Sequence, residues 1–202
     1  MPQIAFIGEC MLELSGAQPG SVFGAAKLGF AGDTLNAATY MARTSRLLDP
    51  AQSGTAAYIT ALGRDAYSNA MIAAWQADGI ATDLVRQIDG ALPGLYTIQT
   101  DATGERSFSY WRDQAAAKQV LAGGHDQTIK NAFARFDGFY LSGISLAILS
   151  PADRQNMIRL VAEYADQGGK VYFDTNHRPR LWPDAKTAIE IYQAIAPYCD
   201  TV

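Results

Sequence analysis

The 202-residue sequence is poor in cysteine and histidine, which limits the metal and redox chemistry available to it. Its two cysteines, Cys10 and Cys199, lie far apart and form no C-x-x-C motif. This pattern favours buried thiols in a reducing cytoplasm over a disulfide or a metal site. The two histidines, His125 and His177, also lack metal-ligand spacing, so we expect no zinc site. We place His125 in a surface turn, because it follows two glycines.

Basic residues and long apolar runs are also scarce. Sixteen Lys and Arg stand against 20 Asp and Glu, which gives a net charge of −4 and a pI near 5.1. With no basic cluster, we expect no nucleic-acid partner. The longest apolar run, 138–149, contains serines and is shorter than the ~20 residues of a membrane span. The first ten residues are typical of a strand rather than a signal peptide, so we expect a cytoplasmic protein.

Several nucleotide and hydrolase motifs are missing. The first predicted strand is followed by GECML instead of G-x-G-x-x-G, which disfavours a dinucleotide site. Neither a G-x-x-x-x-G-K-[ST] loop nor a G-x-S-x-G elbow occurs. Any phosphate chemistry would therefore use a cradle other than the Walker type.

The sequence does contain a regular alternation of buried strands and helices. Such alternation predicts an α/β fold with a mostly parallel sheet. Residues 95–112 differ, because two alternating segments flank a Gly-containing turn, as in a β-hairpin. Together with the Gly-rich segment 19–32, this hairpin predicts a small sheet that projects from the main domain. Strands are predicted at 4–8, 56–63, 137–143 and 170–174, and helices at 34–48, 66–78, 151–169 and 185–198. In the first of these helices, Leu35, Ala38 and Ala42 lie on one face.

One face of the predicted hairpin combines aromatic rings with a cation. Side chains alternate along a strand, so Tyr96 lies on one face of the first strand, and Phe108, Tyr110 and Arg112 share one face of the second. Rings pack on sugar C–H groups, and a guanidinium binds carboxylate or phosphate through two hydrogen bonds. The alternative is that the rings fill a contact between sheets and that Arg112 is solvated.

A second group of polar residues follows the last predicted strand. Asp174 ends this strand, and Asn176 and Arg178 follow in a loop that Pro179 keeps extended at Arg178. Ligands of open α/β sheets bind beyond the carboxyl ends of the strands. The loop could thus hold a ligand, or Asp and Asn turns could simply hold it in place.

The helix predicted at 34–48 begins with polar groups. Gly32 precedes Asp33 and Thr34, either of which could cap the helix, and Asn36 lies in the first turn. Bare N–H groups and the positive end of the helix dipole lie here. This start can be a plain cap or the floor of a sugar site.

Several longer segments together resemble the ribokinase-like (PfkB) sugar kinases. They are IGECMLELS, GFAGDTLNAATYMAR, LPGLYTIQTDATGERSFSYWRDQAAAK, YLSGISLAILSP and GGKVYFDTNHRPRLW. The resemblance implies a three-layer α/β/α sandwich with a small β-sheet lid. It treats residues 1–202 as a single, incomplete domain whose lid segments cover about 10–32 and 94–113. The lid sheet could also pair with a second copy of the chain.

The resemblance also implies phosphorylation of a small sugar acid by ATP and Mg²⁺. By analogy, Arg112 faces the substrate carboxylate, and Arg178 lies where the sugar acid meets the nucleotide phosphates. Asn176 and His177 accompany Arg178 at the nucleotide, His177 through its backbone. The residues implied for the sugar acid are Gly32, Asp33, Tyr96, Tyr110, Arg112 and Arg178.

The family's glycine-rich turn with the aspartate base has no counterpart in these residues. The resemblance therefore places the general base beyond Val202, as in a chain truncated at its C-terminus, and assigns neither a catalytic residue nor a metal ligand here. Without base and anion hole, we expect the 202 residues alone to be inactive. Two other functions stay open: a PfkB-type kinase for fructose, ribose or a nucleoside, and a sugar-acid-binding module without catalysis.

Overall fold

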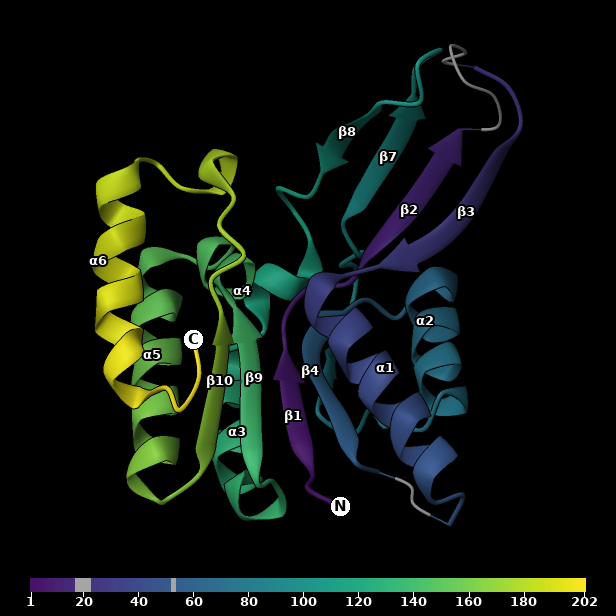
Figure 1. The fold of residues 1–202 in the computed structure, drawn as a ribbon. Coiled ribbons are helices and arrows are strands. Elements are labelled where there is room, and N and C mark those ends of the chain that lie inside the picture. The colour runs from purple at the N-terminus through teal and green to yellow at the C-terminus, as the bar shows by residue number, and fades with distance from the viewer. Residues whose placement is uncertain (17–22, 52–53) are drawn as a thin grey trace.

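The main sheet has six parallel strands, in the order β10-β9-β1-β4-β5, with β6 also paired to β4. The computed structural model describes residues 1–16, 23–51 and 54–202. The predicted parallel sheet is confirmed (Figure 1). The strands are β1 (Ile4–Ile7), β4 (Ala56–Leu62), β5 (Ile80–Ala81), β6 (Val85–Gln87), β9 (Gly138–Ser142) and β10 (Lys170–Asp174).

Helices cover both faces of this sheet, so the three-layer α/β/α arrangement is confirmed (Figure 1). On one face lie α1 (Asp33–Leu48) and α2 (Ala66–Ala77). The other face is covered by α3 (His125–Asn131), α5 (Pro151–Asp166) and α6 (Ala185–Ile195), with the short α4 (Gly143–Ala147) after β9. Short 3₁₀ helices cover Ala116–Gln119, Ala122–Gly124, Phe133–Arg135, Pro179–Leu181 and Ala196–Tyr198.

The strand β1 separates two hydrophobic cores. Ala5 and Ile7 point into the core under α3, α5 and α6, whereas Ile4 and Phe6 point into the core under α1 and α2. All four residues are at most 8% exposed, as expected for a strand covered on both sides. The helix residues at a spacing of three and four, Leu35, Ala38 and Ala42, line the second core as the sequence predicts.

A separate four-stranded sheet, called here the small sheet, has the order β3-β2-β7-β8. Its strands are β2 (Met11–Gly16), β3 (Ala26–Ala31), β7 (Leu95–Thr100) and β8 (Arg106–Trp111). The hairpin β7–β8 is confirmed, and β2 pairs with β7 in parallel and with β3 antiparallel. Residues 17–22, which fall within the predicted segment 10–32 and overlap the predicted segment 19–32, lie outside the described residues.

Two local predictions are wrong. His125 does not lie in a surface turn: it is the first residue of α3, and its ring Nδ1 lies 2.8 Å from the carbonyl oxygen of Val120. The predicted helix 185–198 ends at Ile195, because Pro197 cannot donate the next helical hydrogen bond and the chain tightens into a 3₁₀ turn. In the described part of the chain, none of the helices combines the length and apolar character needed to cross a membrane.

Candidate functional site

The main sheet reverses its direction of winding at β1. The chain passes from β1 to its neighbour β4 on one side and later returns to β9 on the other side. In open parallel sheets, ligands bind beyond the carboxyl ends of the strands at such a switch point. Glu9 follows β1 directly at this place, and Ser142 and Asp174 end the neighbouring strands β9 and β10. The candidate site is built from these strand ends and from the base of the small sheet.

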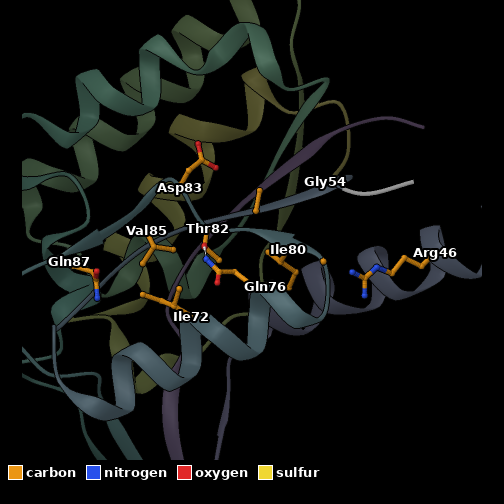
Figure 2. A pocket seen from close by; sticks show the side chains of 11 residues that line it. Arg46, Gly54, Ile72, Gln76, Ile80, Thr82, Asp83, Val85 and Gln87 are labelled. Atoms are coloured by element: carbon orange, nitrogen blue, oxygen red, sulfur yellow. Dashed lines mark hydrogen bonds between the residues drawn. The ribbon is translucent and has the colours of Figure 1, made fainter. Parts of the chain in front are cut away.

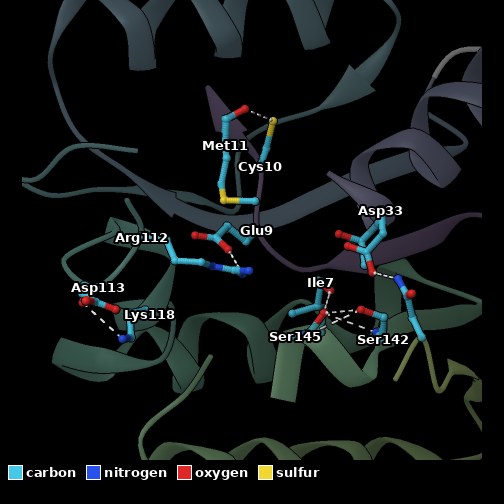
Figure 3. A network of polar contacts seen from close by, with 12 residues as sticks. Ile7, Glu9, Cys10, Met11, Asp33, Arg112, Asp113, Lys118, Ser142 and Ser145 are labelled. Carbon is cyan, nitrogen blue, oxygen red and sulfur yellow. Dashed lines mark hydrogen bonds and ion pairs between the residues drawn. The ribbon is translucent and has the colours of Figure 1, made fainter. Parts of the chain in front are cut away.

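A buried ion pair joins the two sheets at this point. The Arg112 guanidinium, just after β8, donates through Nη2 to Glu9 Oε2. The side chains are only 12% and 2% exposed. Gly94, just before β7, packs on both residues, since a Cβ there would lie 3.1 Å from Glu9 Oε1 and 3.3 Å from Arg112 Cβ. Figure 3 shows the pair beneath Cys10 and Met11. Arg112 is therefore neither solvated nor free.

The pKa of the Glu9 carboxyl is set by effects that oppose each other. Burial raises its pKa, the Arg112 guanidinium lowers it, and the net pKa lies above the usual 4.5. The Asp33 carboxylate raises it further, and Lys118 lowers it. Glu9 Oε1 is buried without a hydrogen-bond partner among the described residues. A buried carboxylate oxygen in this state is costly, which marks the site as built for more than stability.

The predicted aromatic face of the small sheet is confirmed by the strand register. Glu13 on β2 pairs with Tyr96 on β7, and Tyr96 pairs with Tyr110 on β8. The rings of Tyr96 and Tyr110 lie 5.8 Å apart, and the Tyr96 hydroxyl donates to Glu13 Oε2. Burial and the bond to Glu13 raise the pKa of this hydroxyl, so it stays protonated and keeps donating to Glu13. Arg112 Cζ lies 5.9 Å from the centre of the half-exposed Tyr110 ring.

The start of α1 differs from both predicted caps. The N-cap is Gly32, in an extended conformation without a side-chain cap. A Cβ at Gly32 would overlap the carbonyl oxygen of Glu9, so only glycine allows this close approach. Thr34 is buried and bonded to the Tyr58 hydroxyl at 3.0 Å. Asp33, now free of capping, accepts a hydrogen bond from Asn176 Nδ2 at 2.8 Å.

The loop after β10 has the extended shape predicted at Arg178, with φ −123° and ψ 96°. Asn176 has φ 30°, and its backbone N–H donates to Asp174 Oδ1 at 2.9 Å. His177 Nδ1 lies 3.0 Å from the Tyr192 hydroxyl. Arg178 is exposed and donates to the His177 carbonyl oxygen at 3.3 Å.

The structure brings most of the predicted site residues together, but not all of them. Direct contacts join Asp33 to Asn176, and a second set joins Tyr96, Tyr110 and Arg112. Gly32 belongs with the second set through Glu9. Among the described residues, no hydrogen bond or ring contact joins Arg178 to either set, and its side chain bonds only to the His177 carbonyl oxygen.

The sequence analysis missed two carboxylates of the site, Glu9 and Glu13. Each had a signal in the sequence. Glu9 is an acidic residue directly after a buried strand and its glycine, where ligands of parallel sheets bind. Glu13 alternates with Leu12 and Leu14 as in a strand with one polar face.

A groove lies elsewhere, at the outer edge of the main sheet (Figure 2). It has a volume of about 610 Å³ and is lined by α2 and by the residues around β5 and β6. Its charged residues are already engaged, because Asp83 pairs with Arg135 and Arg46 donates to the Ala77 carbonyl oxygen. None of the predicted site residues lines this groove. Within the described residues, no group of three or more His, Cys, Asp or Glu could hold a metal.

Comparisons with known proteins identify the family of the chain. The model of the pfkB family carbohydrate kinases matches residues 1–202. The chain belongs to this family. Among curated pfkB relatives, the 2-dehydro-3-deoxygluconokinase of Escherichia coli K12 is 47% identical over 200 residues, which cover 98% of this chain and 61% of the relative. The chain thus spans about three fifths of the length of that relative.

Solved structures show the same pfkB fold. A PfkB protein from Polaromonas has a TM-score of 0.84 at 22% identity, and the match covers 99% of this chain and 64% of that one. A sugar kinase of Pyrococcus horikoshii in complex with ATP has a TM-score of 0.74 at 17% identity, over 98% of this chain and 61% of that one. At these identities the likeness supports the fold, which is the ribokinase-like α/β fold expected from the sequence.

Proposed function

We propose that the full-length gene product transfers the γ-phosphoryl group of ATP to 2-dehydro-3-deoxygluconate and forms the 6-phosphate. The 47% identity to the E. coli kinase supports this substrate. The structural observation that carries the proposal is a guanidinium, Arg112, held beside the Tyr110 ring at the switch point of the sheet. A neutral sugar has no need of a cation there, whereas a sugar acid does.

In this proposal the small sheet acts as the lid, through segments 10–32 and 94–113 of a single domain. The rings of Tyr96 and Tyr110 pack on the C–H groups of the sugar. The remaining N–H groups of Arg112 take the sugar carboxylate, and Arg178 adds positive charge from the opposite loop. Gly32 and Asp33 at the start of α1 bind sugar hydroxyls, with Asp33 held in place by Asn176.

For the nucleotide we propose Asn176, His177 and Arg178. The loop is exposed at the carboxyl end of β10 and presents an amide and a guanidinium, groups that suit phosphate. His177 contributes its backbone, because its ring faces the Tyr192 hydroxyl. ATP supplies the phosphoryl group when bound. We assign no residue to Mg²⁺; the described part of the chain contains no group of three or more His, Cys, Asp or Glu that could hold it.

Phosphoryl transfer to a panel of acceptors tests the proposal. ADP release by the full-length gene product is measured with 2-dehydro-3-deoxygluconate, fructose, ribose and a nucleoside. We expect turnover with the sugar acid and little with the neutral sugars. Preference for a neutral acceptor would point to another PfkB-type kinase, and tight sugar-acid binding without turnover would point to a binding module.

We place the reaction in the cytoplasm, since both cysteines are free thiols.

Pairing of two copies through the small sheet is a further part of the proposal. The strand register places Leu28, Phe30 and Trp111 on the face opposite Tyr96 and Tyr110. These three side chains are 47%, 39% and 61% exposed, and an exposed apolar sheet face is typical of an interface. Sedimentation of the wild type and of Trp111→Lys tests it, since a dimer through this face would dissociate in the variant.

A further inference from the structure

The two oxygens of the Glu9 carboxylate have different surroundings. Oε2 accepts from Arg112, whereas Oε1 is buried without a partner among the described residues. The side chain is 2% exposed, so water does not reach it freely. An ionised carboxylate with one bare oxygen depends for its stability on the nearby cation. Whatever changes the state of Arg112 therefore changes the state of Glu9.

The charged and titratable groups around Glu9 come from every neighbouring element. Arg112 follows β8, Lys118 lies in the 3₁₀ helix after it, and Asp33 begins α1. Cys10 and Tyr58 lie on the other side, and burial raises the pKa of both well above the usual values, so they stay neutral. Glu9 and Arg112 thus compensate each other, and Asp33 adds a negative charge that Lys118 opposes.

Binding of a sugar acid changes this balance, and this step rests on the proposed function. A ligand carboxylate on the free N–H groups of Arg112 would place a second anion beside a cation that Glu9 already neutralises. The excess negative charge would sit in a poorly solvated junction, where it is expensive. We propose that Glu9 takes up a proton on Oε1 when an anionic ligand binds to Arg112. Glu9 thus acts as a positioning residue: it holds Arg112 in place but no longer neutralises its charge, which then pairs with the ligand.

The proton comes from the solvent, and no other bond forms or breaks. The carboxylate becomes a neutral acid that still accepts from Arg112 through Oε2, so the guanidinium keeps its position. The new O–H on Oε1 has no acceptor among the described residues, so in this proposal it donates to the carboxylate of the ligand. Burial already raises the pKa of Glu9, and loss of the opposing effect of Arg112 raises this pKa further, so the direction is uptake.

Calorimetry of sugar-acid binding in two buffers of different ionisation enthalpy measures this proton. We expect the wild-type full-length protein to take up a measurable fraction of a proton per bound sugar acid. Glu9→Gln, which keeps the shape and the acceptor oxygen, should bind without proton uptake. The matched control Asp83→Asn, which alters the exposed pair with Arg135, should take up the same fraction as the wild type.

The pH dependence of affinity separates this role from a merely structural one. Wild-type affinity should fall as the pH rises, by up to about tenfold per unit. Glu9→Gln resembles the protonated acid, so its affinity should be independent of pH and no weaker than that of the wild type at about pH 8. A variant that binds more weakly at every pH, or wild-type binding without proton uptake, would overturn the inference alone. Wild-type protein that binds no sugar acid would overturn the proposed function, and this inference with it.

Discussion

The side-chain amide of Asn176 donates to the carboxylate of Asp33 over 2.8 Å, although the two residues are 143 positions apart in the sequence. The bond ties the loop after β10 to the first turn of α1. Asn176 adopts φ 30°, a left-handed conformation that costs free energy for any residue with a Cβ. The fold holds Asn176 in this conformation through the bond from its own N–H to Asp174.

Substitution of Asn176 separates the hydrogen bond from the backbone strain. We expect Asn176→Ala to lower the free energy of unfolding by about 2 kcal/mol, because the bond is lost and the strain remains. Asn176→Gly loses the same bond but tolerates the backbone, so about 1 kcal/mol is expected. Urea denaturation of both variants measures the difference. Equal losses would show that φ at this position carries no strain.

Arg112→Ala should weaken sugar-acid binding by roughly 10- to 150-fold. A hydrogen bond to a charged group contributes about 1.5–3 kcal/mol, and ~1.4 kcal/mol corresponds to a factor of ten. Titration of the full-length protein with the sugar acid and with the matching neutral sugar alcohol measures the effect, and the alcohol should lose much less. Arg106→Ala, at the far end of β8, serves as the matched control. Similar losses of affinity for both ligands would show that Arg112 does not bind the carboxylate of the sugar acid.

Arg154 holds the end of α4 from inside the protein. Its guanidinium donates to the carbonyl oxygens of Leu146, Ala147 and Leu149 and lies 4.9 Å from the centre of the Trp182 ring. We expect Arg154→Ala to reduce the free energy of unfolding by about 3 kcal/mol, since buried acceptors lose a charged donor. Arg159→Ala, an exposed arginine on the same helix, should change it by less than about 0.5 kcal/mol. Chemical denaturation compares the two, and similar values would contradict the capping role.

Asp65, the N-cap of α2, makes the free energy of unfolding depend on pH in the acidic range. Burial raises the pKa of its carboxyl, but hydrogen bonds from the Ser68 hydroxyl and from the Tyr67 and Ser68 N–H groups outweigh burial, and the pKa lies below 3.8. Because the folded pKa is lowered, the stabilisation is complete above the unfolded pKa and is lost as the pH falls through the folded one.

Asp65→Asn should therefore differ most from the wild type near neutral pH. We expect a deficit of about 1 kcal/mol there, typical of an altered cap, and a smaller deficit as the pH drops below about 4. Thermal unfolding of both proteins over this range tests it. The control is Asp89→Asn, because the Asp89 side chain is 90% exposed. The difference in stability between this variant and the wild type should not shrink as the pH falls. A constant deficit at every pH would mean that the charge of Asp65 does not matter.

The sequence alone was sufficient to predict elements in which apolar side chains recur at a regular spacing. The apolar spacing of Leu35, Ala38 and Ala42 predicted a buried helix face, and the alternation in β7 and β8 predicted that Tyr96 and Tyr110 share a face. Both patterns arise from the repeat of the local backbone, so local sequence contains them.

Contacts between distant segments could not be derived in this way. The cap of α1 is Gly32 rather than Asp33 because the Glu9 carbonyl, on another segment, approaches it closely. The partner of Glu9 is 103 positions away, and neither pattern nor propensity indicates such a pairing. The pairing of β2 with β7 was missed for the same reason, because it depends on the fold and not on the local alternation of Leu12, Glu13 and Leu14.

The small sheet is connected to the rest of the protein by chain segments that meet at one place. The segment after β1 contains Glu9, the segment after β3 contains Gly32, and those flanking the hairpin contain Gly94 and Arg112. Three of these residues lie against the fourth, Glu9. The buried Glu9 carboxyl thus lies where the segments that connect the small sheet to the main sheet meet. Any movement of the small sheet relative to the main sheet would therefore change the surroundings of the Glu9 carboxyl.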